Sequence, residues 1–380
     1  LLGVFAVFMS KLRLRILWLN LHLILALSFG LLFVLQGLTG SINLFRDEID
    51  QFLHPELLVH PEQHPPLSLD QLLAVVHEAE PDRNGVWTLE LPSNSQQALI
   101  AWFEKPRESV GAFYAPFMLY INPYNGAILA RRFWGQTEVT WLYDLHSHLC
   151  LGQQGREYLA YIAVFLAISA ISGLILWWPG CRGLFLSFRV RFSTWTDFSY
   201  DIHRLWGFFT SLGLLILALS GFYLTTPELI EKLTQTQGMG HGDEGPTVRS
   251  TGIQGSRQIT LAEVVLIARG PFSQAQLRRI TTPLGDTGTY KVNFRQSDEF
   301  NHRHPLTSVW IDRWSAQIRD VQNPKRFTPA QKFVSFLWPL HTSEAFGEWG
   351  RVIWLLLGLS PFVLYVSGIA LYLNRRRKKR

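Results

Sequence analysis

Four long stretches of this 380-residue chain contain no Lys, Arg, Asp or Glu: residues 16–45, 158–178, 205–224 and 352–373. Each has at least 20 residues, the length that an α-helix needs to cross the hydrocarbon core of a bilayer. Charged residues make up only 17% of the chain and are concentrated between these stretches. The pattern excludes a disordered or fibrous chain. It predicts a membrane protein with two large inserts, one within each pair of spans.

The distribution of charge predicts how the chain is oriented. The formal net charge of +6 on its own would suggest a nucleic-acid partner. The two terminal segments and the loop after the second span, however, hold 13 bases and two acids, whereas the remaining segments carry a net charge of −5. Because Lys and Arg are retained on the cytoplasmic side, we expect a bacterial inner-membrane protein with both termini in the cytoplasm, both inserts in the periplasm and no nucleic-acid partner.

The expected organisation is α+β, with each insert enclosed by two transmembrane helices. Amphipathic periodicity predicts one short helix in each insert, at residues 67–79 and 259–269. Alternating apolar residues predict strands at 86–91, 98–103, 118–121, 127–131, 290–294, 309–312 and 316–318. We expect helices over 12–45, 157–178, 203–225 and 351–374, periplasmic domains over 46–156 and 226–350, a cytoplasmic loop over 179–202 and a basic tail over 375–380.

The two halves of the chain repeat one another. His22 is followed after 17 and 18 residues by Thr39-Gly40, and His203 is followed at the same distances by Ser220-Gly221. His146 and His341 share five further matches, at 6, 9, 10, 26 and 27 residues beyond the histidine: Gly152, Gly155, Arg156, Ser172 and Gly173 in the first half, Gly347, Gly350, Arg351, Ser367 and Gly368 in the second. Such spacing predicts two parallel repeats related by an axis along the bilayer normal.

The four duplicated histidines are the candidate functional residues. The repeat axis brings His22 opposite His203 near the cytoplasmic face and His146 opposite His341 near the periplasmic face. Two facing imidazoles suit the two axial positions of a haem iron, whereas zinc takes four ligands or three and a water. We therefore expect two bis-histidine b-type haems. The alternative is that these are interfacial histidines bonded to backbone carbonyls, with the tryptophans forming a belt at the lipid headgroups.

Other residues have lesser expected roles. His148 is an alternate ligand for His146, although its counterpart in the second half is Ser343. Arg156 and Arg351, and Arg204 with Arg13 or Arg15, could neutralise haem propionates, although snorkelling cations are common at span ends. The seven histidines in polar insert segments are expected to be surface residues. Because His22 lies roughly 30 Å from the outer end of its helix at 1.5 Å per residue, two haems would form an electron path across the membrane.

These features resemble the PepSY-associated transmembrane family of bacterial inner-membrane proteins over residues 12–374. The resemblance is carried by His22 with Thr39-Gly40 and the acidic run at 46–50, by Leu145-His146 through Gly155-Arg156, and by hairpins ending Ile121-Asn122 and Ile311-Asp312. Asn122 stands where many PepSY hairpins have Asp. The resemblance implies four transmembrane helices, two periplasmic PepSY-like domains, and di-haem reduction of Fe(III) in ferric siderophores of the ferrioxamine (hydroxamate) type during iron uptake.

The chemistry of the substrate is consistent with this expectation. Hydroxamates are hard oxygen donors that hold Fe(III) more tightly than Fe(II), so one electron delivered outside the membrane would release iron. Candidate contacts for the chelate are four tryptophans of the inserts and their borders: Trp134, Trp141, Trp338 and Trp349. No nicotinamide or flavin fingerprint occurs in the short cytoplasmic segments, so the electron donor would be another protein, a quinol or a small reductant. The alternatives are a transporter or permease, and a cofactor-free PepSY-type binding protein.

Overall fold

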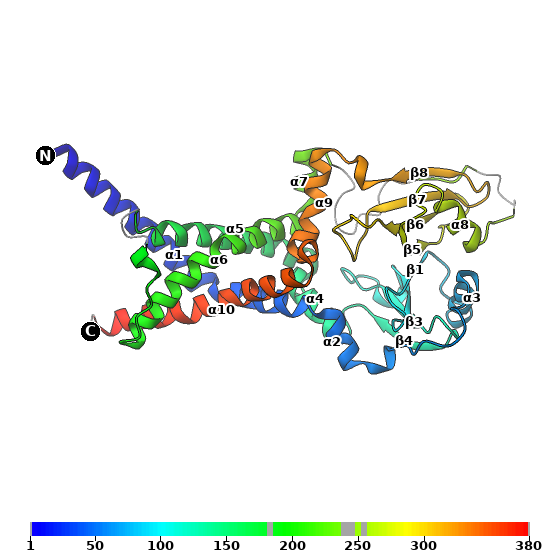
Figure 1. Ribbon diagram of the computed structural model, residues 1–380, viewed down its shortest axis with the longest axis horizontal. Helices are drawn as coiled ribbons and strands as arrows, with labels where there is room; N and C mark the ends of the chain where they lie inside the picture. Colours follow the sequence, from blue (N-terminus) through cyan, green and yellow to red (C-terminus); the bar gives the residue numbers. More distant parts are fainter. Residues whose placement is uncertain (1, 181–184, 237–247, 252–256, 379–380) are drawn as a thin grey trace. The chain divides into compact units, whose positions relative to one another are not determined.

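The computed structural model of the chain describes residues 2–180, 185–236, 248–251 and 257–378 (Figure 1). The chain divides into two compact units. A helical unit comprises Leu1–Leu44, Leu145–Pro227 and Leu340–Arg380, and an α+β unit comprises Phe45–Asp144 and Glu228–Pro339. Three of the bases that predict the orientation, Arg182, Lys379 and Arg380, lie outside the described residues.

The helical unit is a bundle of four long helices: α1 (Leu2–Asn43), α5 (Gly152–Trp177), α6 (Trp195–Thr225) and α10 (Gly347–Arg377). Helices α1 and α6 each pack against both α5 and α10, so α1 lies diagonally opposite α6. All four are long and apolar enough to cross a membrane. Helix α6 begins earlier than residue 203, because the hydroxyl of Thr194 caps its first turn by accepting the Asp197 N–H at 3.1 Å. Helix α10 extends into the basic tail.

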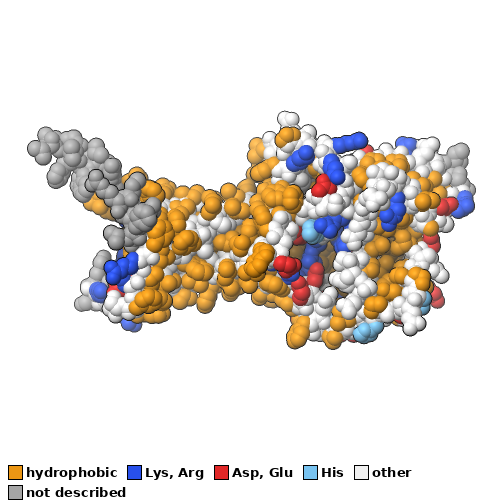
Figure 2. Space-filling view, viewed as in Figure 1, with side chains coloured by type: hydrophobic (Ala, Val, Ile, Leu, Met, Phe, Trp, Pro, Cys, Tyr) orange, Lys and Arg blue, Asp and Glu red, His pale blue; other side chains and the backbone are white. Residues whose placement is uncertain are grey.

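The outside of the bundle is apolar and its inside contains small polar residues. Figure 2 shows hydrophobic side chains along the helices on the face in view. Leu31, Phe209 and Leu212 are each about two-thirds exposed, which is unfavourable in water but suits a surface covered by lipid. Ser172 and Ser220, by contrast, are fully buried. This distribution agrees with a membrane-embedded bundle whose polar contacts are made between its helices.

A short helix precedes the second long helix of each half: α4 (Glu138–His148) before α5, and α9 (Pro329–His341) before α10. Both are separated from the long helix by a tight turn with left-handed residues. Gly152 has a φ of 60° in the first turn, and Gly347 has the same φ in the second. Glycine adopts this conformation without the steric penalty of a side chain. The repeated glycine six residues after His146 and His341 therefore marks these turns.

The α+β unit contains one antiparallel sheet of eight strands in the order β4-β3-β2-β1-β5-β6-β7-β8. The first insert provides β1–β4 and the second provides β5–β8, so the first strands of the two inserts meet at the centre. The strands are β1 (Trp87–Glu90), β2 (Leu99–Phe103), β3 (Phe117–Ile121), β4 (Ile128–Phe133), β5 (Gln276–Thr281), β6 (Thr289–Arg295), β7 (Thr307–Asp312) and β8 (Ile318–Gln322).

The pairing of β1 with β5 joins the two inserts. Leu89 lies opposite Ile280, and the hydroxyl groups of Thr88 and Thr281 are 2.9 Å apart. The sequence predicts two separate α+β domains over 46–156 and 226–350, whereas the structure has a single shared sheet and assigns the ends of both ranges to the helical unit. Strand β5 escapes prediction because a bulge at Arg278 interrupts its alternation.

Helices α3 (Leu69–Ala79) and α8 (Leu261–Ala268) cover one face of this sheet and enclose the main apolar core. Each begins with a capping box, formed by Ser68 and Gln71 in α3 and by its counterpart in α8. The carboxylate of Asp70 in α3 accepts the Leu261 N–H of α8 at 2.8 Å, which ties the two helices together. The remaining helices of the chain are α2 (Arg46–Leu53) and α7 (Pro227–Thr234).

Candidate functional site

The four duplicated histidines form two pairs inside the helical unit. The inner pair consists of His22 on α1 and His203 on α6, whose ring centroids are 6.3 Å apart with the ring planes at 86°. The outer pair consists of His146 on α4 and His341 on α9, also 6.3 Å apart, at 39°. The structure thus brings together the residues that the repeat predicts as partners.

His148 does not take the place of His146. Its Nδ1 accepts the backbone N–H of Gly152 at 3.3 Å, in the turn between α4 and α5. Of the two candidates for the first-half member of the outer pair, it is His146 that lies against His341. The corresponding turn of the second half has Ser343, which requires no second histidine.

Each of the four imidazoles is held at Nδ1 by a hydroxyl and a backbone carbonyl of a neighbouring helix. The hydroxyl oxygens of Ser172, Ser367, Thr39 and Ser220 lie 2.9, 3.0, 3.0 and 2.9 Å from Nδ1 of His22, His203, His146 and His341. The carbonyls belong to the residue three positions before each hydroxyl: Ser169, Leu364, Gln36 and Leu217. One arrangement therefore occurs four times.

These contacts determine which nitrogen carries the proton. Each of the four hydroxyl groups donates its own proton to a carbonyl of its helix, as Ser172 does to Ser169 at 2.8 Å. Both neighbours of Nδ1 are then acceptors, so Nδ1 is the donor and Nε2 retains its lone pair. Burial lowers the pKa of His146 to about 4 and that of His341 to about 3. The outer pair is therefore neutral at pH 7, the form that binds a metal.

The glycine that follows each of these hydroxyl residues makes room for the imidazole. A Cβ atom on Gly40 would lie 2.8 Å from Cε1 of His146, and one on Gly221 would lie 3.2 Å from Cε1 of His341. At the inner pair the corresponding distances are 3.2 Å at Gly368 and 3.5 Å at Gly173. The repeated Ser/Thr-Gly pair is thus a cradle for histidine, in which the hydroxyl holds the ring and the glycine admits it.

The spacing of the rings agrees with two ligands on one metal ion. Metal–imidazole bonds of about 2 Å, with roughly 1 Å from Nε2 to the ring centre on each side, place two such centroids about 6 Å apart. The observed separation is 6.3 Å in both pairs. In the described part of the chain, no three His, Cys, Asp or Glu side chains come together to hold a metal ion. The donor set is therefore a pair of axial imidazoles, which suits haem rather than zinc.

The arginines predicted to flank the pairs all contact backbone carbonyls. Arg156 donates to the carbonyl of Leu224 at 3.1 Å, and Arg351 donates to that of Leu44 at 2.9 Å. Each thus binds the C-terminal end of the first long helix of the other half, where a cation is favourable. Arg204 lies 3.3 Å from the carboxylate of its own helix at residue 201 and donates to a carbonyl at residue 189.

The four candidate tryptophans fall in different surroundings. Trp134 is buried, and its Nε1 donates to Asp144 at 2.8 Å. Trp338 is half-buried and packs against His304 with ring centroids 5.2 Å apart. Trp141 and Trp349 are exposed.

A polar and aromatic network on the open face of the sheet connects Trp134 to Trp338, and sequence reasoning missed its members. Trp102 lies beside Trp134, with ring centroids 6.1 Å apart, and donates to Glu90 at 3.0 Å. Glu90 pairs with Arg279 at 3.1 Å across the β1–β5 junction. Arg279 in turn lies 3.2 Å from Nδ1 of His304. Strand alternation indicates that Trp102 faces away from the core, but only the β1–β5 pairing reveals the network.

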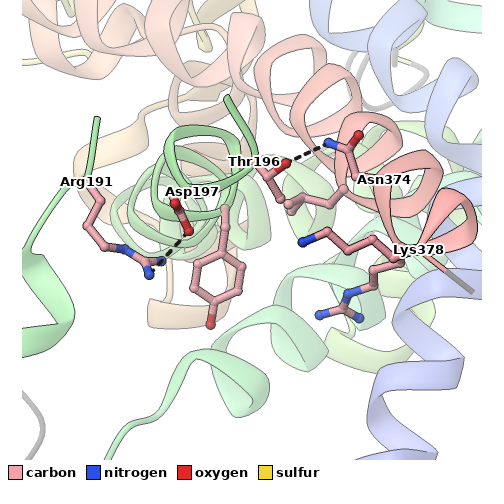
Figure 3. Close-up of a pocket in the computed structure, with 8 residues that line it drawn as sticks. Arg191, Thr196, Asp197, Asn374 and Lys378 are labelled. Atoms are coloured by element: carbon pink, nitrogen blue, oxygen red, sulfur yellow. Dashed lines mark hydrogen bonds and ion pairs between the residues drawn. The ribbon is translucent and has the colours of Figure 1, made fainter. Parts of the chain in front are cut away.

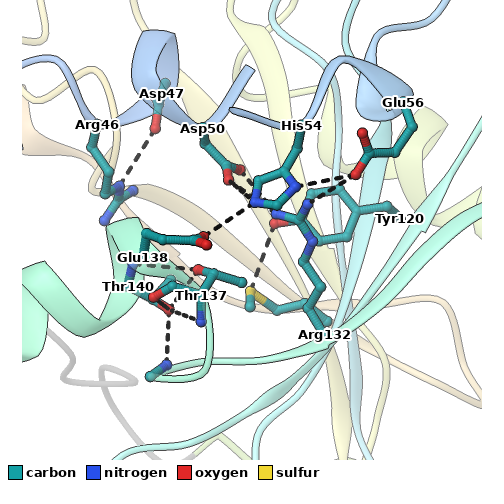
Figure 4. Close-up of polar contacts among 12 residues, drawn as sticks. Arg46, Asp47, Asp50, His54, Glu56, Tyr120, Arg132, Thr137, Glu138 and Thr140 are labelled. Carbon is teal, nitrogen blue, oxygen red and sulfur yellow. Dashed lines mark hydrogen bonds and ion pairs between the residues drawn. The ribbon is translucent and has the colours of Figure 1, made fainter. Parts of the chain in front are cut away.

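His54 also has a defined role that the sequence does not indicate (Figure 4). Its ring lies 3.1 Å from Glu56 and 3.3 Å from Glu138, the first residue of α4. Arg132 of β4 binds Asp50 at 3.0 Å in the same cluster. These ion pairs tie the end of α2 to the start of the helix that carries His146. Another histidine expected at the surface, His241, lies outside the described residues.

The fold and the paired histidines define a membrane protein with a four-helix bundle, two buried imidazole pairs and an α+β unit. The chain belongs to the family described as the PepSY-associated TM region, whose family model matches residues 19–375. This match confirms the family resemblance of the sequence. Comparison with curated proteins gives no match.

Proposed function

We propose that this protein is a di-haem oxidoreductase of the bacterial inner membrane, which passes electrons across the bilayer to reduce Fe(III) in ferric siderophores of the hydroxamate type. Its most important support is the geometry of the two imidazole pairs, each 6.3 Å between ring centroids. The tautomer is the second support, because the carbonyls beside Nδ1 leave the Nε2 lone pairs available. Interfacial histidines with no shared ligand would need no such fourfold repetition.

The residues of the chain have distinct tasks in this proposal. A haem, when bound, supplies reversible one-electron transfer at a potential set by its axial ligands and surroundings. His22 with His203 would hold one haem, and His146 with His341 would hold the other. Since His146 lies against Thr39, the pairs are about 25 Å apart along α1 at 1.5 Å per residue. The apolar helices around them exclude water, which restricts proton and solvent access to the path.

The proposed substrate reaction is a single electron transfer. Fe(III) in the chelate gains one electron and becomes Fe(II), for which hydroxamate oxygens have lower affinity. The electron comes from a reductant on the cytoplasmic side. We assign substrate contacts to the tryptophans of the α+β unit and its borders, with the cations Arg46 and Arg279 beside them. Arg46 lies over Trp134, 5.3 Å from the ring centroid. We propose that this unit is periplasmic, as the charge distribution predicts.

A visible absorption spectrum of the purified protein tests the cofactor. We expect a Soret band that shifts on addition of dithionite and a haem content of two per chain. A protein without a Soret band would contradict the proposal. The substrate is tested separately: reduced protein mixed with ferrioxamine under anaerobic conditions should reoxidise and release Fe(II) that ferrozine captures. Absence of reoxidation would retain the haem assignment and reject the siderophore.

The same spectrum discriminates between this proposal and its alternatives. A transporter with a parallel repeat, or a cofactor-free PepSY-type binding protein, would show no haem absorption. Haem absorption without electron transfer to any ferric chelate would favour an electron carrier for another acceptor. Each outcome thus assigns the chain to a different functional class.

A further inference from the structure

A polar pocket lies at the end of the bundle where α6 begins and α10 ends (Figure 3). Its volume is about 220 Å³. Pockets for drug-sized ligands are about 300–1,000 Å³, so this pocket accommodates one small polar group rather than a nucleotide or a flavin. All of its lining residues belong to the helical unit and none is part of the histidine pairs.

The charge of the pocket is positive. Three bases line it, Arg191, Arg375 and Lys378, against one acid, Asp197. Arg191 is already occupied, because it donates to the buried carboxylate of Asp201 at 2.9 Å and lies 3.4 Å from Asp197. Arg375 and Lys378, by contrast, form no ion pair with any carboxylate in the described residues. Two positive charges at the pocket are therefore available to an anion.

Hydrogen-bond donors complete the site. The amide of Asn374 donates to Oγ1 of Thr196 at 3.2 Å, so the hydroxyl proton of Thr196 is left to donate to a bound group. Thr196 is also the second residue of α6, a helix of 31 residues. The first backbone N–H groups of such a helix point toward the pocket end and favour negative charge. Cations, a hydroxyl and a helix N-terminus together are the donors that recognise phosphate oxygens.

The surroundings of the pocket indicate where the phosphate group comes from. Helices α6 and α10 are both able to cross a membrane, so the pocket lies at a bilayer surface. Leu371 gives the pocket an apolar wall. Trp195 and Phe192 are exposed beside it, by 67% and 80%, and aromatic residues of this kind are typical of the headgroup region. Basic pockets between transmembrane helices on the cytoplasmic side bind the headgroups of anionic lipids.

We propose that this pocket binds a phosphate-bearing anion, which in the membrane is the headgroup of an anionic phospholipid. Arg375 and Lys378 neutralise the phosphodiester, Thr196 and the start of α6 donate hydrogen bonds to it, and the acyl chains lie along the apolar surface of α10. The bound lipid would join α6 of the second half to the end of the chain. This assignment does not depend on haem or on the siderophore.

The test uses the full-length protein in a neutral detergent, with thermal midpoints measured by tryptophan fluorescence. Short-chain phosphatidylglycerol should raise the midpoint, and phosphatidylcholine should not. The double variant Arg375→Gln/Lys378→Gln should bind phosphatidylglycerol roughly tenfold or more weakly, since each base near the surface contributes to anion affinity. The matched control is Arg376→Gln/Arg377→Gln, which removes the same charge from the same helix outside the pocket and should bind normally.

Further arms identify the ligand and protect the test against misfolding. Inorganic phosphate that displaces phosphatidylglycerol at millimolar concentration would make free phosphate the ligand, whereas failure to displace it would make the lipid the ligand. If the double variant is not folded, Thr196→Val tests the same site without a change in charge, and should weaken binding several-fold. Equal responses to the two lipids, or equal losses in the double variant and its control, would overturn the proposal.

Discussion

The Nδ1 atom of His341 lies 2.9 Å from the hydroxyl oxygen of Ser220. Because the hydroxyl proton is already donated to the Ile216 carbonyl at 2.7 Å, Ser220 can only accept from the ring. The hydroxyl therefore fixes both the orientation of the imidazole and the nitrogen left for a ligand.

Ser220→Ala should weaken the outer haem site without unfolding the bundle. Loss of an orienting partner of a metal-binding histidine typically costs 10- to 100-fold in affinity or activity. We expect a comparable loss of outer-haem affinity and a shifted reduction potential, measured by redox titration of the absorption spectrum. Ser211→Ala is the control, since Ser211 on the same helix bonds only to the Gly207 carbonyl in its own helix. Equal effects of the two substitutions would contradict the positioning role.

Alanine at the cradle glycines should have graded effects. A Cβ atom on Gly40 would come within 2.8 Å of His146, whereas one on Gly173 would stand at an ordinary contact distance of 3.5 Å from His22. Gly40→Ala should therefore displace His146 and reduce the outer haem content, and Gly173→Ala should leave the inner haem in place. Pyridine haemochrome assays give the content per chain. Retention of both haems in Gly40→Ala would show that the cradle tolerates displacement.

Single histidine substitutions should remove one haem at a time. His22→Ala should abolish the inner haem and His146→Ala the outer one, each leaving a protein with half of the original haem absorbance. His148→Ala is the matched control, because its ring binds Gly152 and does not face His341. A halved haem content in His148→Ala with full content in His146→Ala would reverse the assignment.

Asp312 should make the stability of the α+β unit sensitive to acid. Burial alone would raise the pKa of its carboxyl, but the backbone N–H groups of Ser315, Thr251 and Trp314 donate to it and hold that pKa well below its ordinary value. A carboxyl with a lowered folded pKa stabilises the fold above its unfolded pKa of about 4 and loses that contribution as the pH falls further.

Asp312→Asn should therefore reduce the free energy of unfolding at pH 7 by about 1–3 kcal/mol, the range for hydrogen bonds to a charged group. The loss should diminish below pH 4, where the wild-type carboxyl itself becomes protonated. Denaturant unfolding of the full chain at several pH values measures both effects. The exposed Asp82 provides the control, and Asp82→Asn should leave the free energy unchanged at every pH.

The two β-hairpins should respond oppositely to exchanges of glycine and alanine. Ala316 has a φ of 64° in the turn after β7, where the equivalent turn of the first insert has Gly126 at 76°. A left-handed conformation costs an L-residue about 1–2 kcal/mol. Ala316→Gly should stabilise the protein by about 1 kcal/mol, and Gly126→Ala should destabilise it by at least as much. Thermal unfolding of both variants checks the sign, and the same sign for both would contradict the argument.

The helices and the histidine pairs could be predicted from the sequence because both depend on regular spacing. An uncharged stretch of 20 residues has few alternatives to a membrane-spanning helix, and the five identical offsets after His146 and His341 fixed the alignment of the two halves. The structure explains these offsets physically: a left-handed glycine, a close packing position, a cation at a helix end, and a hydroxyl with a glycine for the ring.

The shared sheet and the network on its open face could not be predicted in this way. Strand β5 pairs with a strand of the other insert, so no local pattern specifies its neighbour, and the bulge at Arg278 obscures its alternation. The ion pair of Glu90 with Arg279 forms only through that pairing. The carbonyl contacts of Arg156 and Arg351 likewise join the two halves, whereas the repeat specifies only what each half has in common.

The pairing of β1 with β5 imposes an order of events on biosynthesis. Thr88 and Thr281 are 193 residues apart, so at about 5–20 residues per second the ribosome needs roughly 10 to 40 seconds to supply the second strand. During that interval the first insert has an incomplete sheet whose edge can pair with other chains. The edge strand is only four residues long and ends in Glu90, two properties that discourage such pairing. The nascent half-protein thus carries its own protection against aggregation until its duplicate emerges.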